Sequence, residues 1–161
     1  MKMARMLTAV ALIIGTSRVV SGQDGHDHAP GDQQLTQHDQ LRIAVQEICP
    51  VSGEKLGEHG TPIKAKVGQE TVYLCCEGCL QDKINPQHWA TIHANIAHAQ
   101  RICPIMKKAL PKNPKWTIVD GQIVYVCCPG CTKKIEADPR KHLRKVDELY
   151  AASLQARRVR R

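Results

Sequence analysis

Short, mostly apolar runs of strand length occur twice along the chain, each time as a pair. The first pair covers residues 63–67 and 71–75, and the second pair covers residues 116–119 and 123–127. Residues 63–67 alternate between apolar and polar, as is typical of a half-buried strand. The second pair is separated by Asp120-Gly121, and Asp-Gly between two apolar runs is a strong hairpin signal. The pattern therefore predicts two β-hairpins.

A helical pattern follows each hairpin. Residues 80–84 and 132–137 have this pattern, and each stretch is followed by Asn or Asp before Pro, at Asn85-Pro86 and Asp138-Pro139. This dipeptide marks the start of a further helix, because Pro fits the first helical position. Residues 38–47 and 89–101 should form lead-in helices ahead of each half. We therefore predict an α+β fold of two tandem small units, each a β-hairpin with a cysteine knuckle followed by a helix.

The eight cysteines fall into two sets of the same form, and this repeat organises the chain. The sets are Cys49, Cys75, Cys76 and Cys79, then Cys103, Cys127, Cys128 and Cys131. Each set reads Cys-Pro, a long gap, then Cys-Cys-x-Gly-Cys, and the flanking residues also repeat. A period of about fifty residues indicates a tandem duplication.

The N-terminal pattern predicts export. Lys2 and Arg5 precede an apolar stretch at residues 6–15, and small residues follow before a polar segment. This is the layout of a secretory signal peptide, and the apolar stretch is too short to span a bilayer. We expect a periplasmic or secreted protein with no stable membrane insertion after signal removal. The expected organisation is a signal peptide at 1–22, a disordered polar spacer containing histidines at 23–37, a first metal-binding unit at 38–98, a second at 99–150, and a basic tail at 151–161.

Charge and composition narrow the partners. The formal charge is +8, and it falls to +5 without the signal peptide. The excess is concentrated in the tail, which we interpret as a solvated helix end. An exported protein rarely meets nucleic acid, and the aromatic residues that stack bases are scarce, with no Phe, two Trp and three Tyr. So few large apolar side chains give a thin core, and the cysteines should add stability as disulfides or as metal ligands.

The cysteine spacing predicts a soft-metal site in each unit. Cys75, Cys76 and Cys79 follow the second strand of the hairpin, and Cys49 enters from the preceding helix. Thiolates favour zinc, copper(I) and similar soft ions, and we expect one ion per unit. Adjacent residues on a strand point to opposite faces, so Cys75 and Cys76 should not readily share an ion. Two ligand sets remain open, with either Cys75 or Cys76 joining Cys49 and Cys79.

Both copies resemble the YHS/TRASH family of small heavy-metal-binding domains. The resemblance rests on Cys-Pro-Val-Ser-Gly at 49–53, Tyr-Leu-Cys-Cys-Glu-Gly-Cys at 73–79 and Asn-Pro at 85–86, and on their counterparts at 103–106, 125–131 and 138–139. It covers about residues 46–150. The resemblance implies a hairpin followed by a helix, and a role in metal sensing, trafficking or resistance. The family pattern, one cysteine and then Cys-x-x-x-Cys after a long gap, carries over to Cys49, Cys75 and Cys79 and to Cys103, Cys127 and Cys131.

Two departures from the family pattern concern the ligand set. Cys76 and Cys128 stand where many members have another small residue, and the gap of 23 to 25 residues is slightly long.

Other side chains are weaker metal-ligand candidates. Met106 follows Cys103 where the first copy has Ser52, and its thioether would favour copper(I), although packing is the commoner use of Met. Seven of the eight histidines fall into three groups: those that would bind metal weakly (His26, His28, His38), candidate fourth ligands (His88, His142) and ordinary helix-face residues (His93, His98). Surface positions are the expected reading for the second group.

We therefore interpret the chain as an exported, non-enzymatic heavy-metal-binding protein that acts in metal trafficking, buffering or resistance. The expected partner is a metal-transport or efflux protein. The sequence contains no Gly-rich phosphate loop and no Ser-His-Asp pattern. One alternative is a disulfide-stabilised or structural-zinc interaction module, since exported proteins form disulfides. A second is a thiol-disulfide redox protein, because each copy contains Cys-x-x-Cys. A thioredoxin-like motif needs a βαβ context, which the hairpin pattern does not supply.

Overall fold

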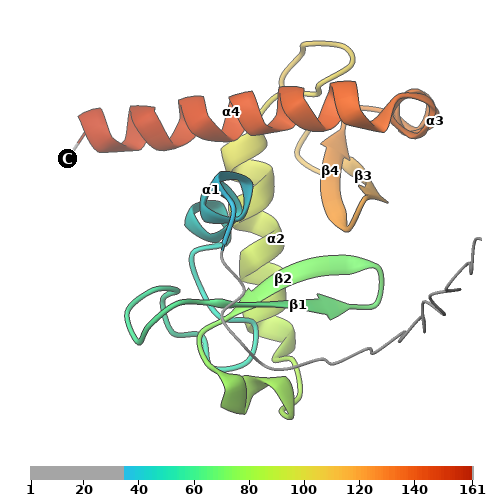
Figure 1. Ribbon diagram of the computed structural model, residues 1–161. Helices are drawn as coiled ribbons and strands as arrows, with labels where there is room; N and C mark the ends of the chain where they lie inside the picture. The colour runs from blue at the N-terminus through green and yellow to red at the C-terminus, as the bar shows by residue number, and fades with distance from the viewer. Residues whose placement is uncertain (1–34, 161) are drawn as a thin grey trace, which may run out of the picture. The chain divides into compact units, whose positions relative to one another are not determined.

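The computed structural model describes residues 35–160, and these form an α+β fold (Figure 1). The signal peptide and most of the spacer predicted above lie outside the described residues. In chain order the elements are α1 (Gln37–Gln46), β1 (Ile63–Val67), β2 (Glu70–Leu74), the 3-10 turn η1 (Glu77–Leu80), α2 (Pro86–Gln100), β3 (Lys115–Val119), β4 (Gln122–Val126), α3 (Pro129–Ala137) and α4 (Pro139–Val159). The predicted fold class, two hairpins each followed by helical structure, is confirmed.

Each hairpin is an antiparallel pair of five-residue strands, β1 with β2 and β3 with β4. The outer strands β1 and β3 are half-exposed, whereas every residue of β4 is buried. The second strand of each hairpin ends one residue earlier than predicted, at Leu74 and Val126. The first cysteine of each knuckle therefore lies just beyond the sheet.

The predicted helix starts are confirmed at both Pro positions. Asn85 caps α2 by accepting from the Gln87 N–H, and Asp138 caps α4 by accepting from the Lys141 N–H. Proline at the first helical position costs nothing there because that N–H has no partner in the helix.

One helical prediction is wrong. Residues 80–84 are not a helix, and only the 3-10 turn η1 forms after the first knuckle. The second copy has Pro129 at the first position of α3, where the first copy has Glu77. Proline presets the helical φ, which favours continuation into a full α-helix. In the first copy the chain is instead held by the Asn85 N–H, which donates to the Pro50 carbonyl at 2.9 Å.

Helix α1 of the first copy packs into the main core cluster with residues of the second copy, while a separate cluster that includes Leu56 and Tyr73 lies within the first copy. The main cluster combines Val45 of α1 and Ala99 of α2 with Val124 of β4 and with Val146 and Tyr150 of α4. Helix α4 contacts both α1 and α2, and α2 leads from the first copy to the second (Figure 1). The expected boundary between residues 98 and 99 falls inside α2, which belongs to both copies.

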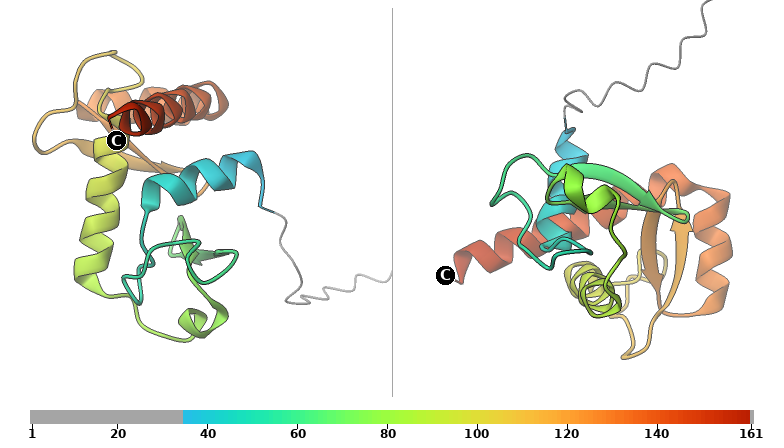
Figure 2. Two further views of the ribbon diagram at one scale, coloured as in Figure 1. Left: turned by 90° about the vertical axis from the view of Figure 1, so that its left-hand side faces the viewer. Right: turned by 90° about the horizontal axis from the view of Figure 1, so that it is seen from below.

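The hairpins also touch each other directly. The Thr71 N–H at the turn end of β2 donates to the Gly121 carbonyl at 2.7 Å, and strands β2 and β4 lie close together at this point (Figure 2). Gly121 has φ +75°, and a Cβ there would lie 2.3 Å from the Thr71 hydroxyl oxygen. The close approach therefore requires glycine. Among the described residues, no helix is both long and apolar enough to cross a bilayer.

Candidate metal centre

The first cysteine of each set lies in a tight loop after a helix. The Cys49 N–H donates to the Glu54 carbonyl at 2.8 Å, and the Gly53 N–H donates to the Cys49 carbonyl at 3.0 Å. An isolated bridge between Ile48 and Lys55 closes the loop. Gly53 has φ +78°, which glycine adopts readily. The loop thus turns the Cys49 thiol inward, where it is fully buried.

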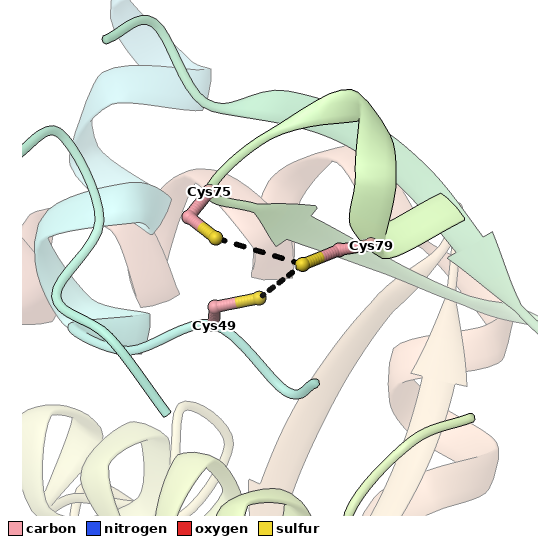
Figure 3. Close-up of side chains that lie close together, drawn as sticks. All are labelled: Cys49, Cys75 and Cys79. Atoms are coloured by element: carbon pink, nitrogen blue, oxygen red, sulfur yellow. Dashed lines mark hydrogen bonds between the residues drawn. The ribbon is translucent and has the colours of Figure 1, made fainter. Parts of the chain in front are cut away.

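The other two thiols of the first site come from the knuckle. Cys75 directly follows β2, and Cys79 lies in η1. The Cys75 and Cys79 sulfurs are 3.6 Å apart, and those of Cys49 and Cys79 are 3.8 Å apart. Figure 3 shows the three thiols pointing toward one another from separate segments. We call Cys49, Cys75 and Cys79 the first thiol site.

The spacing of these sulfurs suits a thiolate-bound ion. A zinc–sulfur bond is about 2.3 Å, so two ligands of a tetrahedral site lie about 3.8 Å apart. The measured separations of 3.6 and 3.8 Å need little adjustment to reach that value. All three sulfurs are buried, with at most 7% of any residue exposed. The donor set and its burial therefore fit a soft metal ion.

The protein prepares one thiol of the first site for ionisation. Burial raises the pKa of Cys49, but N–H groups of Ser52, Cys75 and Val51 outweigh it and lower that pKa from 9.0 to about 7. Burial raises the pKa of Cys75 and of Cys79, and neighbouring sulfurs raise that of Cys79 further. Binding of an ion must therefore displace protons from the site.

The second copy repeats this construction. The Cys103 N–H donates to the Lys108 carbonyl at 2.8 Å, and Lys107, with φ +55°, takes the place of Gly53. Cys127 follows β4 and Cys131 lies in the first turn of α3, with their sulfurs 4.0 Å apart. The sulfurs of Cys103, Cys127 and Cys131, the second thiol site, all lie within 4.8 Å of one another.

Cys76 and Cys128 lie at the mouths of the two sites. Each is exposed and occupies the N-cap position of the turn or helix that follows. An N-cap side chain faces the residue three positions later. Accordingly, the Cys76 sulfur is 3.8 Å from that of Cys79, and the Cys128 sulfur is 3.2 Å from that of Cys131.

This arrangement corrects the expectation that Cys75 and Cys76 face apart. Their sulfurs are 3.9 Å apart because β2 ends at Leu74, so strand alternation does not apply to the pair. Of the two ligand sets left open, the buried cluster is the one with Cys75. Cys76 and Cys128 lie next to the clusters on the solvent side.

Two glutamines that the sequence did not single out hold the ligand segments together. The Gln46 amide donates to the carbonyls of Ile48 and Tyr73 at 2.9 and 2.7 Å and accepts from the Tyr73 N–H at 2.9 Å. It thereby ties the Cys49 loop to the end of β2. Gln100 makes the same three contacts in the second copy, with Ile102 and Tyr125. The repeat in the sequence could have identified these glutamines, because Gln46 and Gln100 are separated by the same 54 positions as Cys49 and Cys103.

The histidine candidates among the described residues are not members of the two clusters. His88 packs on the first loop, with Nδ1 3.1 Å from the Val51 carbonyl, and His38 pairs with Asp147 at 3.0 Å. Both triads found among the described residues consist of cysteine alone. Met106 is 45% exposed. Its backbone N–H lowers the pKa of Cys103, whereas burial raises it. The backbone N–H of Ser52 has the same effect on the pKa of Cys49. His142 is half-buried on α4, and His98 is exposed. His26 and His28 fall outside the described part of the chain.

His93 is not an ordinary helix-face residue. Its Nε2 lies 3.3 Å from a carboxylate oxygen of Glu70, and its Nδ1 lies 3.1 Å from the Tyr125 hydroxyl. The equivalent position in the first copy is Asp39, which accepts from the Tyr73 hydroxyl at 2.7 Å. Each copy thus anchors its knuckle tyrosine on its lead-in helix.

In comparisons with known proteins, no family model, no curated protein and no solved structure matches this chain.

Proposed function

We propose that this protein binds one soft transition-metal ion, copper(I) or zinc, in each thiol site and acts in trafficking, buffering or resistance. The observation that carries the proposal is the presence, in both copies, of three sulfurs within 4.8 Å of one another. Thiolate ligands select soft ions over calcium or magnesium. Burial raises the pKa of Cys75 and Cys79, so placing these thiols together disfavours their ionised form. Bonds from the thiolates to an ion would offset that cost.

The proposal places the protein among binding proteins rather than enzymes. Catalytic zinc sites usually combine histidine or carboxylate ligands with an open position for water. The two triads hold sulfur only, and an exposed thiol, Cys76 or Cys128, lies beside each mouth. This arrangement supports holding and releasing an ion.

Membership of the YHS/TRASH family and export to the periplasm or beyond are part of the same proposal. The first rests on the two Cys-Pro and Cys-Cys-x-Gly-Cys motifs within a hairpin-and-helix fold. The second rests on the N-terminal sequence pattern. A metal-transport or efflux protein is the partner that this role requires.

Native mass spectrometry of the reduced chain, purified anaerobically with zinc or copper(I), tests the proposal. We expect two ions per chain, one after Cys49→Ser or Cys103→Ser, and none after both changes. Cys76→Ser and Cys128→Ser are the matched controls and should leave two ions bound. A folded, metal-free protein with all eight thiols oxidised would refute metal binding and support the disulfide framework.

A further inference from the structure

The two thiol sites are alike in their sulfurs but opposite in the charge around them. Matched segments of equal length carry the ligands, 49–60 with 75–84 in the first copy and 103–114 with 127–136 in the second. The first segments hold four acidic and two basic residues, a formal charge of −2: Glu54, Glu58, Glu77, Asp82, Lys55 and Lys83. The second hold five basic residues and one acidic residue, a formal charge of +4: Lys107, Lys108, Lys112, Lys133, Lys134 and Glu136. We call these sets the first rim and the second rim.

All twelve rim residues are exposed. In the first rim, Lys55 pairs with Glu58 at 3.4 Å, which offsets one charge of each sign and leaves the net charge at −2. The only acidic member of the second rim, Glu136, accepts a hydrogen bond from the Thr117 hydroxyl at 3.1 Å. The two rims therefore present fields of opposite sign to an approaching molecule.

Exposed apolar and thiol groups lie within or next to the same ligand segments as the second rim. Ile102 and Met106 flank Cys103 and are 37% and 45% exposed. Cys128 is exposed at the mouth. Apolar groups beside predominantly basic residues are typical of a contact surface whose charges steer association and whose apolar part makes the contact.

We propose that the second thiol site exchanges its ion with a carrier protein that presents thiols on an acidic surface. The inference rests on the proposed function and adds the kind of partner. The exchange is a substitution without oxidation: a thiol sulfur of the carrier bonds to the ion as the bond from Cys127, the least buried ligand of the second thiol site, breaks. The proton of the carrier thiol passes to the released Cys127 sulfur. The first site, with its acidic rim, does not favour such a carrier.

Two synthetic peptides serve as probes, with the same Cys-x-x-Cys core and flanks of either aspartate or lysine. The full chain is loaded with copper(I) and its stoichiometry is measured before transfer is followed by stopped flow. At low ionic strength, we expect one of the two ions to reach the acidic peptide about tenfold faster than the basic one. The difference should shrink at about 0.5 M salt, where the screening length falls to a few ångströms.

A charge-swap variant identifies the rim responsible. Lys133→Glu with Lys134→Glu should abolish the preference for the acidic peptide while two ions still bind, because both side chains are exposed. Arg158→Glu with Arg160→Glu makes the same change in charge at the far end of α4 and should leave the preference intact.

The possible failures are distinct. If no ion loads, the proposed function and this inference both fall. If two ions load but the rates do not depend on peptide charge, only the inference falls. Binding of the loaded protein to anionic lipid vesicles, lost in the Lys133→Glu and Lys134→Glu variant and without any peptide preference, would overturn it in favour of a membrane surface.

Discussion

Replacing Gln46 with leucine removes the contact that joins the first ligand loop to its knuckle. In a two-stranded hairpin, the N–H and carbonyl of Tyr73 point away from β1, so they have no strand to pair with. The Gln46 side chain supplies both partners, at 2.9 and 2.7 Å, and also binds the Ile48 carbonyl. It stands in for the peptide group of a third strand. Leucine keeps most of the volume and none of the hydrogen bonds.

The expected loss follows from these contacts. Gln46 is 4% exposed and Tyr73 is 1% exposed, so water cannot readily replace the amide. Three hydrogen bonds at about 1 kcal/mol each, with a further penalty for buried backbone groups left unpaired, give a loss of about 3–5 kcal/mol. That is a large part of the ~5–15 kcal/mol that stabilises a typical domain.

Urea denaturation of the reduced, metal-free chain measures the free energy of unfolding. Competition with a chromophoric chelator then measures the affinity of each site. We expect Gln46→Leu to weaken the first site and Gln100→Leu to weaken the second, each leaving the other site closer to normal. Gln155→Leu, at an exposed position of α4, is the control. A loss below about 0.5 kcal/mol for Gln46→Leu, the usual range for surface changes, would refute the role of Gln46 in joining the Cys49 loop to β2.

Two further predictions concern the first site. Gly53→Ala should lower the free energy of unfolding more than Gly57→Ala. Both positions have positive φ, which costs about 1–2 kcal/mol for alanine, but only at Gly53 would the new Cβ meet a side chain, 2.6 Å from His88 Nε2. Equal losses of stability in denaturation experiments would contradict the contact with His88. Metal affinity should fall as pH is lowered, because burial raises the pKa of Cys75 and Cys79 and an ion must displace their protons. For each proton displaced, the affinity should change by about tenfold per pH unit. Chelator competition between pH 6.5 and 8.5 measures this dependence, and an affinity that does not change with pH would contradict it.

Much of the fold follows from local patterns. The hairpins were predicted from short apolar runs separated by turn residues, and the starts of α2 and α4 from Asn85 and Asp138 before proline. These signals are strong because a single residue or dipeptide restricts the backbone. The repeat also identified the four cysteines of each copy, but it left open whether Cys75 or Cys76 joins Cys49 and Cys79.

The parts that could not be predicted depend on contacts or on the end of an element. The position of Cys76 depends on β2 ending at Leu74, and periodicity locates strand ends only approximately. Residues 80–84 are too few for a helical period to be reliable. Gln46 looks like an ordinary polar helix end, and only its contact with Tyr73, 27 positions away, gives it a role.

Helix α2 sets the separation of the two thiol sites. Its N-terminal end is fixed to the first loop through Asn85 and Pro50, and its C-terminal end leads into Cys103. Fifteen helical residues span about 22 Å. At that distance two unit charges interact by about 0.8 kcal/mol at the effective dielectric constant of about 20 that suits protein sites, before salt screening. Filling one site therefore adds less than about 1 kcal/mol to the cost of filling the other, and we expect the chain to take up its two ions one after the other rather than as a pair.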